Sequence, residues 1–211
     1  MLAIFGGTFD PIHKGHLQPV AQAAGQLRIE QVYLLPCHIP PHRQTPAVGA
    51  QQRLEMVRLA CQDNSLFTAD DRELRRNTPS YSFDTLSEFR QQFPDQSIAF
   101  FMGMDAFNHF DSWYRWQDIL KLSHIIVCAR PGYALTHNSV LDKLVGQQAN
   151  QSVNALHDTG SGIIHFAEME LIDISATAIR QQLSAGQPPS DLLHPAVAEY
   201  IRQHGLYTHA T

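Results

Sequence analysis

Two histidines that follow a glycine turn near the N-terminus are the first residues whose types and spacing suggest chemistry. The apolar run Leu2–Phe5 predicts a buried strand, and Gly6-Gly7 lets the backbone turn tightly and bring its N–H groups close to a ligand. The apolar period then becomes helical, so His13 and His16 are expected where a helix begins. A helix N-terminus favours phosphate. On residue types alone, the same histidines could also be exposed loop residues or zinc ligands.

A second group with the same chemistry lies late in the chain, at Ser175, Thr177 and Arg180. The two hydroxyls, the N–H groups of a helix start and a guanidinium would together make a second anion site. The alternative is ordinary: a serine that caps a helix and an arginine on the surface one turn later. Both interpretations remain open from the residues alone.

The composition indicates a protein that acts on small molecules. A chain of 211 residues suits one ordinary domain over residues 1–211 and can bury a sizeable core. The net charge is −5 and the lysines and arginines are scattered, so we expect no nucleic-acid partner. No apolar run is long enough to span a bilayer, so we expect no membrane partner either.

The cysteines point to a reducing compartment. Cys37, Cys61 and Cys128 are odd in number and have no framework spacing, and the N-terminus enters a strand without a signal peptide, so we expect a cytoplasmic protein. Cys37 and His38 with His42 could instead form a zinc-binding module. Prolines interrupt that segment and no second paired cluster completes the ligand set, so we interpret it as a loop near an anionic ligand.

Apolar periodicity and breaker residues divide the rest of the chain into alternating strands and helices. Residues 70–76 carry a run of charges that is typical of a solvated face, and Ser82 is expected to cap the helix that follows it. We expect strands over 2–5, 31–35, 66–68, 97–102, 124–129 and 163–166, and helices from 17 onward and over 51–61, 83–92, 136–151, 175–184 and 195–204.

This alternation predicts an α/β fold: a Rossmann-like, doubly wound parallel sheet with helices on both faces and a C-terminal helical segment. Ligands in such sheets bind beyond the carboxyl ends of the strands. The Gly6-Gly7 turn, the loop 36–46, Gly103 and Arg130 all follow predicted strands, so one cleft could collect them.

Both chemical groups resemble the signatures of one superfamily. The run His13-Lys14-Gly15-His16 resembles the His-x-Gly-His motif of the nucleotidyltransferase superfamily of adenylyl- and cytidylyltransferases. The run Ile174–Arg180 resembles its second motif, Ile-Ser-x-Thr-x-x-Arg. Further segments are similar to the bacterial nicotinate-nucleotide adenylyltransferases, namely Gly6–His16, Pro40–Arg43, Pro79–Ser82, Gly103–Asp105, Trp113-Tyr114 and Arg130–Tyr133. One departure is Ser82, where the family usually has threonine, although the hydroxyl is retained.

The resemblance implies a reaction: transfer of AMP from ATP to nicotinate mononucleotide, which gives deamido-NAD and pyrophosphate by in-line displacement without a covalent enzyme intermediate. It implies Mg²⁺ that arrives with ATP, and we name no protein ligand for it. By position in the motifs, it implies catalytic roles for His16 and His13, ATP contacts from Gly6, Gly7, Thr8, Phe9, Gly103, Asp105, Arg130, Ser175, Thr177 and Arg180, and acceptor contacts from Arg43, Tyr81, Ser82, Trp113 and Tyr114.

Several alternatives stay open. A sister enzyme could prefer nicotinamide mononucleotide, because an amide and a carboxylate have nearly the same shape. A phosphopantetheine adenylyltransferase is a further alternative, against which the Trp113-Tyr114 segment argues. A catalytically idle nucleotide sensor would need no histidine pair, yet His13, His16 and Arg180 are all present. Trp113 and Tyr114 could also be core or surface aromatic residues without a ligand.

Overall fold

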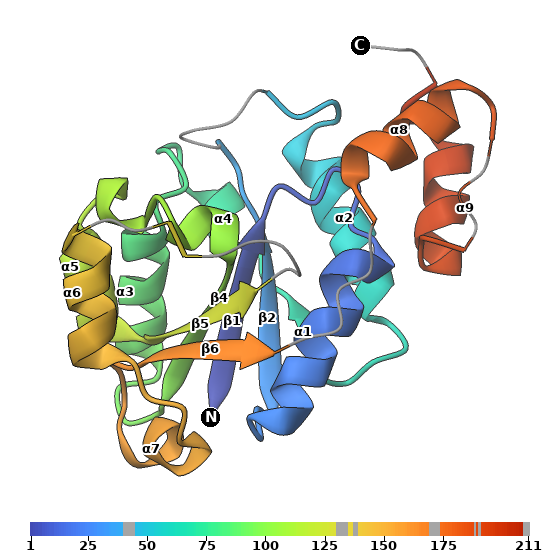
Figure 1. Ribbon diagram of the computed structural model, residues 1–211. Helices are drawn as coiled ribbons and strands as arrows, with labels where there is room; N and C mark the ends of the chain where they lie inside the picture. The colour runs from blue at the N-terminus through green and yellow to red at the C-terminus, as the bar shows by residue number, and fades with distance from the viewer. Residues whose placement is uncertain are drawn as a thin grey trace. The chain divides into compact units, whose positions relative to one another are not determined.

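A computed structural model describes residues 1–39, 45–129, 135, 136, 139–168, 174–187, 189 and 191–208. Within these residues the strands form a six-stranded sheet in the order β3-β2-β1-β4-β5-β6 (Figure 1). The strands are β1 (Leu2–Gly7), β2 (Gln31–Pro36), β3 (Phe67–Ala69), β4 (Ile98–Gly103), β5 (His124–Ala129) and β6 (Ile164–Glu168). The helices are α1 (Lys14–Gln26), α2 (Ala50–Cys61), α3 (Ser82–Gln92), α4 (Met104–Phe107), α5 (Trp116–Leu122), α6 (Ser139–Gln148), α7 (Val153–Asp158), α8 (Ala176–Ser184) and α9 (Pro195–Gln203), with short 3-10 helices η1 (Arg72–Arg75) and η2 (Phe110–Ser112).

The strands pair in parallel, with β1 beside β4, β4 beside β5 and β5 beside β6. In the first two pairs Leu2 lies opposite Ile98, and Phe100 lies opposite Ile125. β4 is buried over nearly its whole length, as expected of a parallel strand that is covered on both faces. The predicted α/β fold with a doubly wound parallel sheet is confirmed.

The chain divides into two compact units. Unit 1 contains Met1–Gly6, Gln22–Tyr33 and Tyr81–Glu170, and unit 2 contains Gly7–Ala21, Leu34–Ser80 and Leu171–Thr211. The prediction that residues 1–211 form one domain stays a prediction.

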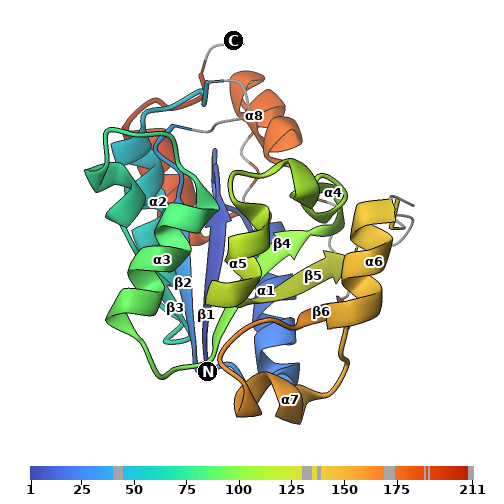
Figure 2. The same ribbon diagram turned by 90° about the vertical axis from the view of Figure 1, so that its left-hand side faces the viewer.

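Unit 1 is held together by an aromatic core and by one arginine. α3 and α5 pack against each other, and in Figure 2 α5 lies in front of β1 and β4 and α3 in front of β2. Phe101, Phe107 and Phe110 are buried; Phe107 and Phe110 stack on each other at 6.0 Å, and Phe101 meets Phe5 edge to face at 6.5 Å. The Arg90 guanidinium, at the end of α3, donates hydrogen bonds to the carbonyls of Leu122, Phe93, Pro94, Gln96 and Gly160. Arg90 therefore fixes the ends of α3 and α5 and the turn near Gly160.

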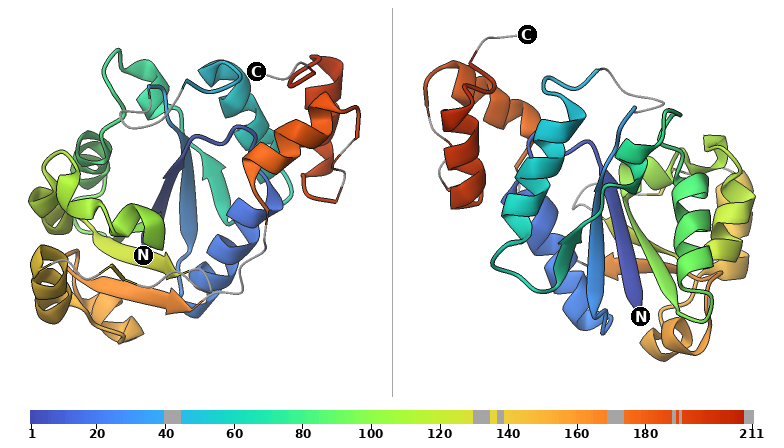
Figure 3. Two further views of the ribbon diagram at one scale, coloured as in Figure 1. Left: turned by 45° about the horizontal axis from the view of Figure 1, so that its top comes forward. Right: turned by 180° about the vertical axis from the view of Figure 1, so that it is seen from behind.

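Unit 2 is built around α2, which packs against β3 and α9; the right-hand view of Figure 3 shows α2 beside the C-terminal helices. The charged run of residues 70–76 is more buried than a solvated face. Arg72 forms a two-pronged ion pair with Asp70 at 2.7 and 2.9 Å, and both side chains are less than one-seventh exposed. Glu73 is 7% exposed. The expectation of a solvated face is wrong for Asp70, Arg72 and Glu73, whereas the Arg75 side chain is 74% exposed.

Several helices differ from the sequence-based prediction. α1 begins at Lys14, before the apolar period starts. Ser82 is the first helical residue of α3 rather than its cap, because Tyr81 is extended and its carbonyl accepts the first helical N–H groups. α7 lies where a loop was expected; Ser152 caps it, and buried Leu156 anchors it. No helix in the described part of the chain is long and apolar enough to cross a membrane.

Candidate active site

The two histidines of the first motif form a stacked pair in unit 2. Their ring centroids are 3.7 Å apart and the rings are inclined by 28°. The His13 N–H donates to Nδ1 of His16 at 3.3 Å, and the His16 N–H donates to the His13 carbonyl at 2.9 Å, which closes the first turn of α1. Because Nδ1 of His16 accepts, the neutral ring carries its proton on Nε2. His13 is buried and His16 is half-buried, so the pair places a ring donor at the start of a helix.

Two glycines permit this arrangement. A Cβ on Gly15 would lie 3.0 Å from Nδ1 of His13 and 3.1 Å from Cβ of Ile174, so glycine lets the start of α1 approach the first residue of the second motif. A Cβ on Gly7 would lie 2.8 Å from the Phe9 ring. Phe9 has a φ of +49°, and its ring meets the His16 ring edge to face at 5.2 Å. The glycines are therefore needed for close packing around the histidines.

The second motif lies at the start of α8. The Ser175 hydroxyl accepts the Ala178 N–H at 3.1 Å, so Ser175 is the helix cap that the ordinary interpretation predicts. Arg180 is not a loose surface residue. Its Nη2 donates to the Thr177 hydroxyl at 3.3 Å and its Nη1 donates to the Asp10 carbonyl at 2.8 Å. The structure thus brings the second motif onto the first within unit 2.

Asp10 is a residue that sequence reasoning did not single out, although it lies inside the segment Gly6–His16. It is 6% exposed, and its carboxylate accepts hydrogen bonds from the Ala47 N–H and from the Tyr207 hydroxyl, both at 2.7 Å. Its carbonyl accepts from Arg180. Asp10 therefore joins the histidine segment, the second motif and the C-terminal residues of unit 2.

Arg53 is a second residue that the sequence analysis missed. It is 1% exposed, and its guanidinium donates to the carbonyls of Thr8 and Cys37 at 2.7 Å and of Val48 at 3.3 Å. The signal was its position in α2, on the face that also carries buried Val57 and so points into the core. Through the Thr8 carbonyl, Arg53 holds the backbone next to the Gly6-Gly7 turn, so it is a structural support of the candidate site.

The segment that suggested zinc is held by the protein itself. The His38 N–H donates to the Ser80 hydroxyl at 2.9 Å, and Nδ1 of His38 donates to the Arg76 carbonyl at 2.8 Å. Burial raises the pKa of the Cys37 thiol, although Arg53 opposes this, and a raised pKa disfavours the thiolate that zinc requires. Among the described residues, no group of three or more His, Cys, Asp or Glu could hold a metal ion. His42 lies outside those residues.

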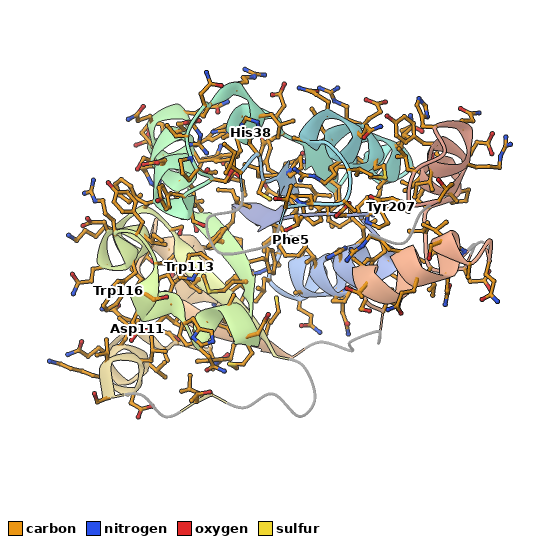
Figure 4. All side chains as sticks on the ribbon, turned by 90° about the horizontal axis from the view of Figure 1, so that it is seen from above. Phe5, His38, Asp111, Trp113, Trp116 and Tyr207 are labelled. Carbon is orange, nitrogen blue, oxygen red and sulfur yellow. The ribbon has the colours of Figure 1, made fainter. Side chains whose placement is uncertain are left out.

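Unit 1 contains an aromatic cluster made of Tyr81, Phe83 and Tyr114, and Trp113 precedes Tyr114 in the chain. The Tyr81 and Tyr114 rings are 4.8 Å apart, and Phe83 meets Tyr114 edge to face at 6.0 Å. Tyr114 is 49% exposed. Half-buried Trp113 instead packs edge to face on Phe100 and Phe110, at 6.3 and 5.8 Å; Figure 4 labels it beside α4. Trp113 is thus anchored on the core, whereas Tyr114 presents a surface with Tyr81.

The other predicted site residues of unit 1 lie near strand and helix ends. β4 ends at Gly103, which caps α4, and a Cβ there would collide with the carboxylate of Asp105. Glycine therefore lets the exposed Asp105 side chain fold back over the end of β4. Ser82 follows Tyr81 at the start of α3, and Gly6 is exposed near the end of β1. Arg43, Arg130 and the residues around them lie outside the described residues.

Comparison with known proteins gives one consistent result. The cytidylyltransferase-like family matches residues 4–182. A protein of Aeromonas hydrophila named "Probable nicotinate-nucleotide adenylyltransferase" is 45% identical over 206 residues, which is 98% of this chain and 96% of the relative. A protein of Pectobacterium atrosepticum with the same name is 46% identical over 209 residues, which is 98% of each chain.

Solved structures agree on the fold. The Plasmodium falciparum nicotinic acid mononucleotide adenylyltransferase complexed with NaAD has a TM-score of 0.72 at 17% sequence identity, over 99% of this chain and 98% of that one. The same enzyme complexed with APC gives 0.71 at 16% identity. On the strength of its sequence relatives, the chain belongs to the nicotinate-nucleotide adenylyltransferase family of cytidylyltransferase-like enzymes.

Proposed function

We propose that this protein transfers AMP from ATP to nicotinate mononucleotide, forming nicotinate adenine dinucleotide and pyrophosphate. The observation that carries the proposal is the hydrogen bond from Arg180 to the Asp10 carbonyl, which joins the second signature motif to the segment Gly6–His16 that contains the first. Relatives with this activity in their names, matched at about equal length, support the same acceptor.

The proposed chemistry is an in-line displacement. A phosphate oxygen of the acceptor attacks the α-phosphorus of ATP, the bond from that phosphorus to the bridging oxygen breaks, and pyrophosphate leaves with the electron pair. Such a reaction depends on positioning and on charge stabilisation rather than on covalent catalysis. His16, through Nε2, and His13 stabilise charge on the α-phosphate, while Gly6, Gly7, Thr8 and Phe9 line the phosphate path.

The leaving pyrophosphate needs its own contacts. Thr177 and Ser175 are exposed at the N-terminus of α8, where helix N–H groups and the helix dipole favour an anion. Arg180 adds a guanidinium whose orientation is fixed by Asp10 and Thr177. We assign the β- and γ-phosphates of ATP to these residues.

The remaining assignments follow the motifs. Gly103, Asp105 and Arg130 contact the adenosine part of ATP. The Tyr81–Tyr114 pair offers an exposed aromatic surface for the pyridine ring, with Trp113 beside it in sequence and Ser82 and Arg43 as polar contacts of the mononucleotide. The hydroxyl of Ser82 serves in place of the family's threonine.

We further propose that Mg²⁺ takes part as a complex with ATP. This ion keeps several waters and is commonly held through substrate phosphates with few protein ligands, and it would neutralise charge on the leaving pyrophosphate. Activity that persists at full rate after chelation, with ATP supplied free of divalent ions, would contradict this role.

We place the reaction in the cytoplasm with small molecules as its only substrates. Free thiols at Cys37, Cys61 and Cys128 support a reducing compartment. A net charge of −5 supports small molecules over nucleic acid. Recovery of three alkylatable thiols from cells lysed under trapping conditions would test the first point.

The function is tested by measuring pyrophosphate release with magnesium and ATP while offering nicotinate mononucleotide, nicotinamide mononucleotide and phosphopantetheine in parallel. We expect the highest kcat/KM with the nicotinate form. A preference for either other acceptor would identify the corresponding sister enzyme, and ATP binding without release from any acceptor would identify a nucleotide sensor.

A further inference from the structure

The C-terminal residues of unit 2 turn back after α9 and insert a tyrosine into the protein. α9 ends at Gln203, and both Gly205 and Tyr207 have positive φ values, of +57° and +61°. Glycine adopts this left-handed conformation readily, but for tyrosine it costs about 1 kcal/mol or more and persists only where surrounding contacts enforce it. Leu206 and Tyr207 are 8% and 7% exposed. Figure 4 labels Tyr207 among the side chains near α8 and α9.

The contact that enforces this conformation is a hydrogen bond to Asp10. The Tyr207 hydroxyl donates to Oδ1 of Asp10 at 2.7 Å, while Oδ2 accepts from the Ala47 N–H at 2.7 Å. Both partners are buried, so the loss of the Tyr207 hydroxyl would take the donor away from Oδ1 of Asp10, while Oδ2 keeps the Ala47 N–H. Burial and the Asp10 carboxylate raise the pKa of Tyr207, so its hydroxyl remains protonated and continues to donate.

Asp10 in turn connects Arg180 and His16, two candidate contacts of the ATP phosphates. Its carbonyl holds Nη1 of Arg180 at 2.8 Å. The residue before it, Phe9, meets the His16 ring at 5.2 Å. A displacement of Asp10 would therefore move the arginine and the histidine together. The proposed chemistry gives Tyr207 no direct role. Its burial in a strained conformation therefore needs another explanation.

We propose that Tyr207 is a positioning residue for ATP: by holding the Asp10 carboxylate, it orients Arg180 and the histidine segment for the phosphates. This inference rests on the proposed function, since it assumes that these residues receive ATP. Tyr207 itself touches no reacting atom. Its removal should weaken ATP binding while leaving acceptor binding unchanged.

The first test is Tyr207→Phe, which removes one hydroxyl and keeps the ring in place. We expect the dissociation constant of a non-hydrolysable ATP analogue, measured by calorimetry without acceptor, to rise about three- to tenfold. The KM for ATP should rise by a similar factor, and the KM for nicotinate mononucleotide should stay within about twofold. The matched control is Tyr200→Phe on α9, whose hydroxyl has no part in the Asp10 network, and it should match the wild-type affinity.

The second test asks whether Tyr207 acts through Asp10. In a double-mutant cycle, Tyr207→Phe should have no further effect on ATP-analogue affinity once Asp10 is replaced by Ala. If that variant fails to fold, Asp10→Asn weakens the bond by removing the charge of the acceptor, and the effect of Tyr207→Phe should then be smaller than in the wild type. Additive effects in the cycle would overturn the proposal. So would a Tyr207→Phe protein that melts earlier but binds the analogue as tightly as the wild type, because its role would then be structural only.

Failure of the function and failure of the inference are separable. A wild-type protein that binds the ATP analogue but does not turn over nicotinate mononucleotide contradicts the proposed function, while the analogue measurement still decides the role of Tyr207. A wild-type protein that binds no ATP analogue overturns both.

Discussion

Arg180 donates a hydrogen bond to the main-chain oxygen of Asp10 at 2.8 Å, although 170 positions separate them in the chain. The bond uses one arm of the guanidinium, and a second arm reaches the Thr177 hydroxyl at 3.3 Å. A planar group held at two points loses little freedom when a phosphate binds to it. The arginine of the second motif is thus prepared for an anion before any anion arrives.

Arg180→Lys tests whether this geometry matters beyond the charge. Lysine keeps the positive charge but cannot hold the Asp10 carbonyl and the Thr177 hydroxyl together. We expect the KM for ATP to rise about tenfold, with a smaller loss in kcat. Arg202→Lys is the matched control, because Arg202 on α9 is exposed and pairs with the exposed Glu199. Equal kinetics for the two variants would refute the positioning of Arg180.

His16→Ala should abolish most turnover without unfolding the protein. The half-buried ring lies at the start of α1, stacked on His13 and not in the core, so its removal costs little packing. We expect kcat to fall by about 10²- to 10³-fold, as found when one transition-state donor is removed. Steady-state kinetics measure the loss of turnover, and a melting curve on the same preparation shows whether the fold is retained. A well-folded variant with near-normal turnover would contradict the assigned role.

Trp113 and Tyr114 are adjacent in the chain but differ in how they pack, so their variants can be compared. Trp113→Ala and Tyr114→Ala should each raise the KM for the acceptor more than the KM for ATP. Trp113 packs on Phe100 and Phe110, so its removal should also lower the free energy of unfolding, by about 2 kcal/mol. Tyr114 is half exposed, so its removal should leave stability nearly unchanged. Equal shifts in the two KM values would remove both residues from the acceptor site.

The sequence predicted the parts of this site that are local in the chain. The strand, glycine turn and helix of the first motif are encoded in consecutive residues, and so is the capped helix start at Ser175. What the sequence could not reveal are bonds between a side chain and a distant main-chain carbonyl. Those of Arg53 and Arg180 are of this kind, because a carbonyl acceptor exists at every residue and leaves no mark in the side-chain pattern.

The contact between Tyr207 and Asp10 could not be predicted from the sequence for a related reason. A tyrosine beyond the last predicted helix has no periodicity to indicate burial. The charged run at residues 70–76 was misjudged because composition alone does not distinguish a buried ion pair such as Arg72–Asp70 from a solvated one.

Stability should fall as the pH is lowered because of two buried histidines in unit 1. His124 accepts the Ile163 N–H on Nδ1 at 3.1 Å and donates from Nε2 to the Thr159 carbonyl at 3.0 Å, so its ring is neutral. Burial lowers the pKa of His124 and likewise that of His165. In the unfolded chain both side chains have a pKa of about 6.5.

Below that pH, and down to the lowered pKa of each folded group, the unfolded state binds more protons than the folded state. The free energy of unfolding therefore has its full value above about pH 6.5 and declines through this window, by about 1.4 kcal/mol for each unit of pKa difference. Urea unfolding at closely spaced pH values measures the slope. His124→Gln, which retains a donor and an acceptor, should flatten it. An unchanged slope would exclude His124 as a cause.

Arg53→Met should destabilise the protein far more than a comparable change on the same helix. The wild-type guanidinium, 1% exposed, serves the carbonyls of Thr8, Cys37 and Val48, and methionine would fill the space while leaving these acceptors buried without a donor. Each such loss costs about 1–3 kcal/mol, and we expect a total of about 3–5 kcal/mol because the site can relax in part. Arg58→Met, at an exposed position of α2, should change stability by less than about 0.5 kcal/mol. Chemical denaturation of both variants measures the difference. Because Arg53 holds Thr8 at the glycine turn, the surviving folded fraction of Arg53→Met should also bind ATP more weakly. A variant that keeps full stability would show that the turn is held by its glycines and histidines alone.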